Sequence, residues 1–405
     1  MSEPRPRILF LTSSWPLGGN FGGQIRSLNL ARALQQVGDV TVSVVGSAAD
    51  DAEARRLTEK EFAVGHAMPG IPTPNRSIAA KLRRAFDSRY LNVHGCTLSA
   101  DDRRRLLDAI PQFDLIWLLN SRTANIAGIW KWPHAHLDID DVPSTYARSA
   151  RQASRSLLER MKLRLEEAML RRREARFLER FTTLSVCSEA DRRYLGGDAR
   201  IHVIPNGFED PHGRLDAPVR PSEELFRIGF IGLHSYAPNR RGVEWFCAQV
   251  WPDIKKAFPQ ARLRLVGRGS EQLAVSDARD IDRLGFVADA SAEIATWSLM
   301  IVPVREGGGT RIKIAEGFAR KCPVVATPLG AFGYEVADRV HLRLAESARE
   351  FAFACNDLLA DPGEAKRMAE RAYGAFREKW TWEAIRPRIV EAAEDCLRRS
   401  AEKCG

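Results

Sequence analysis

Short apolar runs rich in β-branched residues alternate with longer helical patterns along the whole chain. The runs lie at 7–11, 40–45, 114–119, 136–139, 183–187, 201–204, 226–232, 262–267, 284–287, 299–303, 323–327 and 340–344. They are continuous rather than alternating, which is typical of parallel strands covered on both faces. Helical segments such as 24–38 and 349–361 separate them and supply the crossovers. The sequence therefore predicts an α/β protein with two doubly wound, Rossmann-like domains in tandem.

A segment rich in proline, glycine and charge interrupts this alternation from Pro205 to Glu224. It predicts a linker over 206–225, between an N-terminal domain at 1–205 and a C-terminal domain at 226–378. Residues 379–405 have a helical pattern, and we expect them to pack back on the N-terminal domain. Ligands of open α/β sheets bind at the carboxyl ends of the strands, so we expect the two domains to face a central cleft that holds the site.

Composition excludes several classes of protein. The 405 residues are 44% hydrophobic and 28% charged, which is typical of a globular chain rather than a disordered one. The apolar runs are far shorter than the ~20 residues that a bilayer span needs. The seven cysteines are scattered and form no C-x2-C pair, so neither a disulfide framework nor a zinc site is indicated. The first residues lack the pattern of a secretory signal, and we expect a cytoplasmic protein.

The segment from Val302 to Gly333 carries the sharpest functional signal. A strand leads into three consecutive glycines, Gly307–Gly309, and we expect Thr310 to cap the helix that follows. Free N–H groups at the start of that helix, together with Arg311 and Lys313, form a cradle suited to a phosphate group.

Glu316 lies deeper in the same predicted helix. A carboxylate there can accept two hydrogen bonds from ribose hydroxyls, as acidic residues do in other nucleotide sites. The alternative is purely structural, because Lys313 and Arg320 lie three and four residues away and can form ion pairs with Glu316 along the helix. The adjoining glycines favour the functional interpretation.

A second candidate loop follows the strand at 226–232. It contains Asn239, Arg240 and Arg241, and we expect a helix to begin near Gly242. Arginines at such a loop can bind a diphosphate with paired hydrogen bonds. Otherwise they are solvated loop charges, which is the commoner role of arginine.

The first strand of the chain also leads into a glycine-rich loop. Gly22 and Gly23 stand immediately before an amphipathic helix and allow a ligand to approach the backbone closely. The spacing does not fit G-x-G-x-x-G, so a dinucleotide site is not indicated. A tight strand-to-helix turn without a ligand is the equally weighted alternative.

Aspartates end the strand at 136–139. Asp138 and Asp140 form a D-x-D pair, a pattern that can hold a divalent metal, and Asp141 follows directly. Acidic groups at the carboxyl end of a central strand are also suited to acid–base work or to holding a sugar hydroxyl. The structural alternative is a turn capped by aspartate before Pro143.

Most of the net charge of +9 lies in residues 1–205. Two basic amphipathic stretches, 76–90 and 147–181, carry much of it, and the second has an apolar stripe made of Leu158, Met161, Leu165 and Ala168. Both stretches are suited to rest on an anionic membrane surface. A solvated scaffold face is the more frequent explanation of such patterns.

Taken in order, these segments resemble the retaining glycosyltransferases of family 4, also called group 1 glycosyltransferases, which have the GT-B fold. The resemblance covers essentially the whole chain, in ILFLTSSWPLGGNFGGQIRSLNLARAL, VIPNGFE, FIGLHSYAPNRRGVEWF, LVGRGSE and GGGTRIKIAEGFARKCPVVATPLGA. The branch with G-x-G-T-R-x-K-x-x-E matches best.

This resemblance implies a nucleotide-diphosphate-sugar donor held by the C-terminal domain, an acceptor held by the N-terminal domain, and transfer with retention. Glu316 resembles the second glutamate of E-x7-E, which grips the donor ribose. Arg241 stands where a lysine contacts the diphosphate, and Gly22 and Gly23 resemble a loop that closes over the phosphates.

Three places depart from the family pattern, and one is the Leu233–His234 region, where an arginine is common. Gly308 occupies the place of the first glutamate of E-x7-E, so we expect backbone N–H groups of Gly307–Gly309 to contact the sugar instead. Asp140 stands where a histidine is common, and we assign Asp140 and Asp141 as the catalytic candidates. The donor-binding candidates are Gly22, Gly23, Asn239, Arg241, Gly307, Gly308, Gly309, Thr310, Arg311, Lys313 and Glu316.

The sequence thus predicts a sugar transferase acting on a glycan or lipid-linked acceptor in polysaccharide or glycoconjugate assembly, at the cytoplasmic face of a membrane. We expect no metal and no cofactor beyond the nucleotide-sugar co-substrate, because cations and N–H groups can neutralise the diphosphate. We expect no nucleic-acid partner. Two alternatives stay open: a nucleotide-sugar 2-epimerase of the same fold, and a non-catalytic protein that binds polyanions or membranes.

Overall fold

The computed structural model describes residues 4–19, 22–73, 77–154, 156–211, 226–275 and 279–402. The chain divides into two compact units, Met1–Pro205 with Ile385–Gly405, and Asn206–Ala384. Residues 206–211 of the expected linker belong to the second unit, where the backbone N–H of Phe208 donates to the carbonyl of Trp380 at 2.9 Å. The rest of that linker, 212–225, lies outside the described residues.

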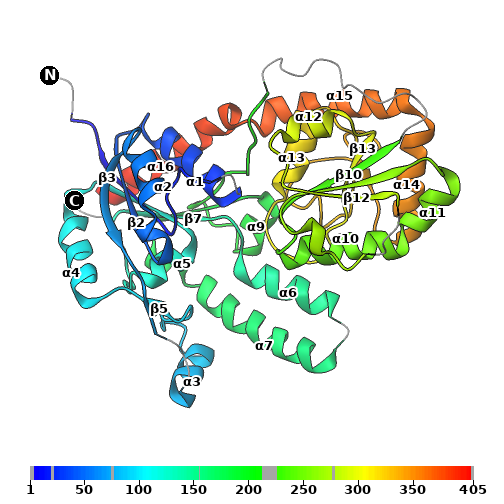
Figure 1. Ribbon diagram of the computed structural model, residues 1–405. Helices are drawn as coiled ribbons and strands as arrows, with labels where there is room; N and C mark the ends of the chain where they lie inside the picture. Colours follow the sequence, from blue (N-terminus) through cyan, green and yellow to red (C-terminus); the bar gives the residue numbers. More distant parts are fainter. Residues whose placement is uncertain are drawn as a thin grey trace. The chain divides into compact units, whose positions relative to one another are not determined.

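In the described residues, the first unit is built on a seven-stranded parallel sheet with the order β3-β2-β1-β6-β7-β8-β9 (Figure 1). Its strands are β1 (Arg7–Thr12), β2 (Asp39–Val45), β3 (Ala63–Met68), β6 (Leu115–Leu119), β7 (Ala135–Ile139), β8 (Thr183–Val186) and β9 (Ile201–Val203). A two-stranded antiparallel pair, β4 (Ile71–Pro72) and β5 (Cys96–Thr97), lies apart from this sheet.

The helices of the first unit are α1 (Gly22–Leu34), η1 (Ser47–Asp50), α2 (Ala52–Glu59), α3 (Ile78–Phe86), α4 (Ala100–Ala109), η2 (Ile110–Gln112), α5 (Asn120–Ile126), α6 (Pro143–Ala153), α7 (Leu157–Glu174), α8 (Phe177–Arg180) and α9 (Glu189–Tyr194). The final helix, α16 (Trp382–Ala401), begins in the second unit and returns to the first at Ile385.

The second unit has a six-stranded parallel sheet with the order β12-β11-β10-β13-β14-β15. Its strands are β10 (Arg227–Ile231), β11 (Arg262–Val266), β12 (Ile281–Gly285), β13 (Leu299–Val302), β14 (Val324–Ala326) and β15 (Arg343–Leu344). Its helices are α10 (Ala237–Gln249), α11 (Trp251–Ala257), η3 (Ser270–Gln272), α12 (Ala290–Ala295), α13 (Ile312–Ala319), α14 (Ala348–Ala360) and α15 (Pro362–Lys379).

Serine side chains cap the N-termini of helices in both units. The hydroxyls of Ser77, Ser99, Ser156, Ser188 and Ser347 each accept a hydrogen bond from an N–H of the first helical turn, at the starts of α3, α4, α7, α9 and α14. These bonds satisfy donors that the helix itself leaves without partners. The local sequence therefore fixes where these helices begin.

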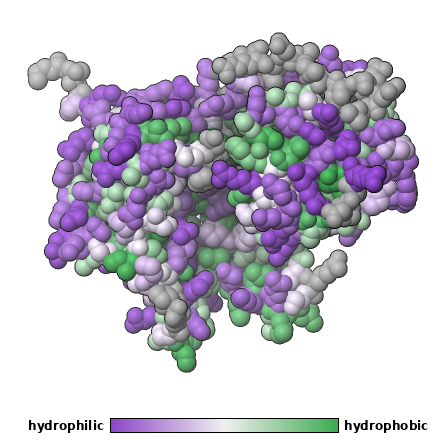
Figure 2. Space-filling model, viewed as in Figure 1, coloured by the Kyte–Doolittle hydropathy of each residue, from purple (hydrophilic) through white to green (hydrophobic). Residues whose placement is uncertain are grey.

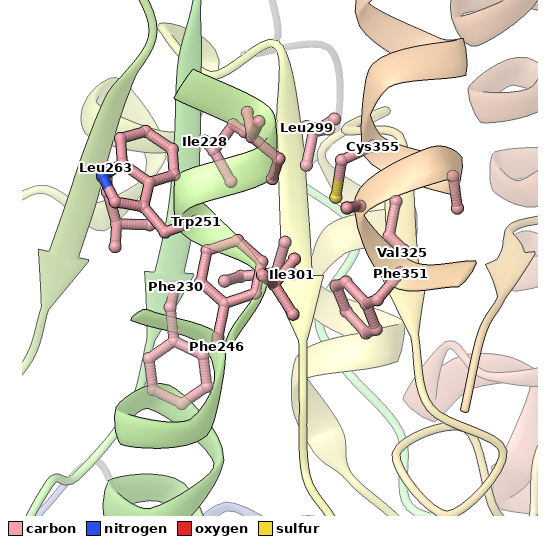
Figure 3. Close-up of a cluster of buried hydrophobic side chains, with 14 of the residues drawn as sticks. Ile228, Phe230, Phe246, Trp251, Leu263, Leu299, Ile301, Val325, Phe351 and Cys355 are labelled. Atoms are coloured by element: carbon pink, nitrogen blue, oxygen red, sulfur yellow. The ribbon is translucent and has the colours of Figure 1, made fainter. Parts of the chain in front are cut away.

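Apolar side chains cover both faces of the second sheet, as the continuous apolar runs predict. One cluster packs beneath α10, α11 and α14 and includes Phe230, Phe246 and Phe351 (Figure 3). The other lies beneath α12, α13 and α15 and includes Trp297 and Phe318. A Cβ on Gly229 would lie 2.0 Å from the Trp297 ring, so this close packing requires glycine in β10.

The prediction of two doubly wound α/β domains is confirmed. Each of the twelve predicted strand segments overlaps a strand, although β12 begins at Ile281, before the predicted run, and β15 covers only Arg343–Leu344. The sequence analysis missed β3, whose residues Gly65 and His66 interrupt its apolar character, and the short pair β4–β5.

Candidate functional site

The strand order reverses at one point in each sheet. The chain runs outward from β1 to β3 and then restarts on the other side of β1 with β6, and in the second sheet β13 restarts beside β10 in the same way. Loops that follow two such neighbouring strands diverge and leave room for a ligand at the carboxyl ends. The predicted loops after β10 and β13 both lie at this position of the second unit, although 74 residues separate Asn239 from Lys313.

The glycine-rich loop after β13 is held by the side chain of Arg311. This guanidinium is buried and donates to the carbonyls of Gly308, Gly309 (2.7 Å) and Glu306 (3.5 Å). Gly307 and Gly309 have φ angles of 118° and 67°, a backbone conformation that favours glycine. Because its guanidinium binds the loop's carbonyls, Arg311 positions the loop in this structure.

Two buried glycines of this loop have backbone N–H groups without an acceptor in the described part of the chain. Gly308 and Gly309 are buried, and among the described residues neither donates a backbone hydrogen bond. Buried N–H groups normally have partners, and groups at a helix start suit an anion. The loop therefore presents donors for acceptor atoms of a ligand.

The prediction that Thr310 caps α13 is wrong. The N-cap residue is Arg311, with no side-chain cap bond, and the helix begins at Ile312. The Thr310 hydroxyl instead accepts a hydrogen bond from Asn206 Nδ2 at 2.9 Å. This contact ties the loop to the first residue of the second unit.

Lys313 and Asn239 join the two loops. Lys313 Nζ donates to Asn239 Oδ1 at 2.7 Å and lies 4.3 Å from the centre of the Phe230 ring. Asn239 Nδ2 donates in turn to the carbonyl of Leu233 at 2.9 Å. Burial, with repulsion from Arg311, lowers the pKa of Lys313 to about 7, although Glu316 opposes this.

Arg241 lies on a helix rather than in a loop. The prediction of a helix start near Gly242 is wrong, because α10 begins at Ala237, with Pro238 in its first turn. Asn239 and Arg241 therefore occupy the first turns of the helix. Arg241 is half exposed and pairs with the buried carboxylate of Glu306, with 2.8 Å between Nη1 and Oε2.

Glu316 pairs with Arg320 one helical turn later, with 3.2 Å between Oε1 and Nη1. The ion pair with Arg320 that the structural alternative predicts is therefore present. The ammonium of Lys313, the other predicted partner, donates to Asn239 instead. Burial raises the pKa of Glu316, and Arg320 and Lys313 partly offset this.

In the first unit, Asp138 is not available for a metal. Both of its oxygens bind Arg26, at 2.6 and 2.8 Å, and Ser185 Oγ donates to Oδ1 at 2.5 Å. Both ionic side chains are fully buried. Burial acts to lower the pKa of Arg26, but the ion pair with Asp138 outweighs it and raises that pKa. The D-x-D metal interpretation is therefore wrong.

Asp140 and Asp141 lie just beyond the end of β7 rather than on the strand. Asp140 is half-buried and accepts a hydrogen bond from Cys187 Sγ at 3.4 Å, and Asp141 is exposed. Gly22 and Gly23 form the first residues of α1, and the preceding loop residues Asn20 and Phe21 lie outside the described residues. Within the described residues, no group of three or more His, Cys, Asp or Glu side chains is arranged to hold a metal.

Sequence reasoning missed Arg26, Glu306 as the partner of Arg241, and Asn206. Arg26 stands among the polar residues of an amphipathic helix, where a buried position has no local signal. Asn206 belongs to the VIPNGFE segment. Because this residue falls in the predicted linker, its contact with Thr310 was not expected.

Comparison with known proteins bears on the family resemblance and on the fold. Residues 226–361, which lie within the second unit, match the family model of group 1 glycosyl transferases. No curated protein compared with the chain matches it significantly by sequence.

Solved structures match over nearly the whole chain. HepE from Anabaena, in complex with UDP-glucose, is 17% identical over 96% of this chain and 99% of its own, with a TM-score of 0.63. Sucrose-phosphate synthase from Thermosynechococcus elongatus is 16% identical over 99% and 100%, with a TM-score of 0.66. WaaG, a glycosyltransferase involved in lipopolysaccharide biosynthesis, is 12% identical over 94% and 98%, with a TM-score of 0.58. At these identities the likeness establishes the fold, two Rossmann-like domains of the GT-B type.

Proposed function

We propose that this protein is a retaining glycosyltransferase that moves a sugar from a nucleotide-diphosphate-sugar donor to a glycan or lipid-linked acceptor in polysaccharide or glycoconjugate assembly. The observation that carries the proposal is the charge at the end of β13. Arg311 and Lys313 hydrogen-bond to neutral oxygens, and among the described residues neither forms an ion pair. A diphosphate supplies the missing negative charge.

The donor site in this proposal consists of three kinds of group. N–H groups of Gly308, of Gly309 and at the start of α13 donate to phosphate or sugar oxygens, Lys313 and Arg241 neutralise the diphosphate, and Glu316 holds the ribose. Arg241 is half exposed, so it can exchange Glu306 for a phosphate at small cost. The bound UDP-glucose in HepE supports a donor of this chemical class.

The reaction we propose is a front-face displacement. The acceptor hydroxyl oxygen bonds to the anomeric carbon while the bond from that carbon to the diphosphate oxygen breaks. The acceptor oxygen enters on the face from which the diphosphate leaves, so the configuration is retained, and the hydroxyl proton passes to the departing diphosphate. Cations and N–H groups stabilise the negative charge that develops on the leaving group, and no metal is required.

We assign the acceptor to the first unit and place Asp140 and Asp141 in the reaction. Carboxylates just after a strand end are suited to hold a sugar hydroxyl or to accept a proton. The α1 N-terminus at Gly22 and Gly23 offers further donors to the phosphates. We place the protein in the cytoplasm, and no nucleic acid takes part.

A screen of nucleoside diphosphates tests the donor half of the proposal. Thermal unfolding is followed with uridine, guanosine, adenosine, cytidine and thymidine diphosphates, with and without a chelator. A ligand at 100 times its dissociation constant stabilises the native state by about 2.7 kcal/mol, so one nucleotide is expected to raise the unfolding temperature selectively and regardless of chelator. The absence of any shift would contradict the proposal.

Product analysis then separates transfer from the alternatives. Nucleoside diphosphate released only in the presence of acceptor, with a product of unchanged anomeric configuration by NMR, is the expected result. Isomerised nucleotide sugar formed without acceptor would identify a 2-epimerase instead. If the unaltered protein shows no turnover, and Glu316→Gln still binds polyanions, the protein is non-catalytic.

A further inference from the structure

Helix α3 of the first unit carries an apolar face that nothing in the described chain covers. Ile78, Leu82 and Phe86 follow one another at a spacing of four residues, which places them on one side of the helix. Their exposed fractions are 76%, 53% and 73%. Large apolar side chains exposed together are uncommon on soluble monomers and mark interaction surfaces.

Helix α7 presents a second apolar stripe. Leu158, Met161 and Leu165 are spaced three and four residues apart and are 81%, 65% and 73% exposed. Another side of this helix packs against α6, where Glu167 binds Arg148 and Arg151 at 3.0 Å each. The stripe is therefore a face that the α6–α7 packing leaves in solvent.

The two helices are joined to each other. The guanidinium of Arg173 on α7 donates to the carbonyls of Arg84 (2.7 Å) and Tyr90 (3.0 Å), at the end of α3 and just beyond it. Figure 1 shows both helices at the lower side of the first unit, away from its sheet. Figure 2 shows apolar surface at this lower side. Arg173 lies at the C-terminal end of α7, whereas the apolar stripe of α7 lies in its N-terminal half, so the two stripes are separate parts of this side. We call their six residues, Ile78, Leu82, Phe86, Leu158, Met161 and Leu165, the α3–α7 apolar face.

Basic side chains accompany this face on both helices. Lys81 and Arg83 lie on α3, and Lys162 and Arg164 lie on α7. Within the described part of the chain, none of these four forms an ion pair, so their charge is open to an outside partner. Apolar side chains flanked by lysine and arginine are the chemistry of helices that lie in the interface of an anionic bilayer.

We propose that the α3–α7 apolar face docks on an anionic lipid surface. The six apolar side chains enter the boundary between headgroups and acyl chains, and the four cations bind lipid phosphates. The attachment is peripheral, and no helix in the described residues is long and apolar enough to cross a membrane. Docking of this kind needs no nucleotide and no acceptor, so it stands or falls independently of sugar transfer.

Vesicle sedimentation of the full-length protein, without substrates, tests the proposal. Vesicles of phosphatidylglycerol mixed with phosphatidylcholine are expected to bind the protein, and vesicles of phosphatidylcholine alone are expected to bind it far less. Each cation contributes about a fivefold factor near an anionic surface, so Lys162→Glu with Arg164→Glu is expected to weaken binding more than tenfold.

The matched apolar variants are Leu165→Ser on α7 and Phe353→Ser on α14, where Phe353 is 59% exposed in the second unit. Loss of binding in Leu165→Ser but not in Phe353→Ser supports the proposal. Equal binding by both variants, or no binding of the unaltered protein, overturns it. Sedimentation velocity tests whether a second copy of the chain covers the face instead. If the unaltered protein is a dimer, Leu165→Ser makes it monomeric and neither binds vesicles, the face is a dimer interface and the proposal is overturned.

Discussion

The two units each bury cations beside a parallel sheet, at points that are not topologically equivalent, and satisfy them differently. In the first unit, Arg26 from α1 meets a carboxylate, Asp138, and both side chains are fully buried. In the second, Lys313 meets an amide oxygen and Arg311 meets backbone carbonyls. Charge at the first point is neutralised within the fold, whereas charge at the second meets only neutral oxygens. We propose that the first arrangement serves stability and the second serves ligand binding.

Removing Arg26 is expected to have the largest effect on stability. Arg26→Met leaves the buried carboxylate of Asp138 without its partner and removes donors from the carbonyls of Ile204 and Pro205. The free energy of unfolding in urea is expected to fall by about 3 to 5 kcal/mol. The matched control is Arg55→Met, at the exposed pair with Glu59, which is expected to cost less than about 1 kcal/mol. Similar losses of unfolding free energy in the two variants would show that the buried pair of Arg26 and Asp138 stabilises the first unit no more than an exposed pair does.

Removing Arg311 is expected to have an intermediate effect. Arg311→Met leaves the buried carbonyls of Gly308 and Gly309 without their donor, which is expected to cost about 1 to 3 kcal/mol in urea unfolding. Arg305→Met is the control, because the Arg305 bond to the carbonyl of Glu346 is exposed, and a change within about 0.5 kcal/mol is expected. A loss as large as that of Arg26→Met would mean that the loop is part of the structural core.

Lys313 gives the smallest effect, and it depends on pH. Its pKa lies at about 7 in the folded protein instead of the ordinary 10.5, so between these values the unfolded chain binds more protons. Stability therefore rises with pH through this window, and Lys313→Met lacks that rise. Relative to the unaltered protein, the variant is expected to lose on the order of 1 kcal/mol between pH 6.5 and 8. Parallel pH profiles in urea unfolding would show that Lys313 is not desolvated.

Sequence alone predicts the fold well because apolar runs report burial directly. The strands that it missed or misplaced are weakly apolar: β3 contains Gly65 and His66, and β12 begins with Ile281 and Asp282. The candidate loops were also found from sequence, since glycine clusters after apolar runs mark strand-to-helix turns.

The pairing of charges was not predictable from sequence. Arg26 and Asp138 are 112 residues apart, and Lys313 and Asn239 are 74 apart. Only the adjacency of β10 and β13 brings Lys313 and Asn239 together. The helix starts also differed from expectation. Helix α10 begins at Ala237, with Pro238 in its first turn, rather than near Gly242, and α13 begins at Ile312 without a side-chain cap.

The central claim is that the end of β13 and the start of α13 bind the donor nucleotide. Titration calorimetry of the stabilising nucleoside diphosphate against the unaltered protein, Glu316→Gln and Glu370→Gln tests it most directly. Glu370 is a half-exposed glutamate of the same unit that pairs with Lys321, so it controls for loss of charge. The account predicts that Glu316→Gln weakens binding at least about tenfold while Glu370→Gln binds normally, both with unchanged circular dichroism. Equal affinity in all three proteins would contradict it.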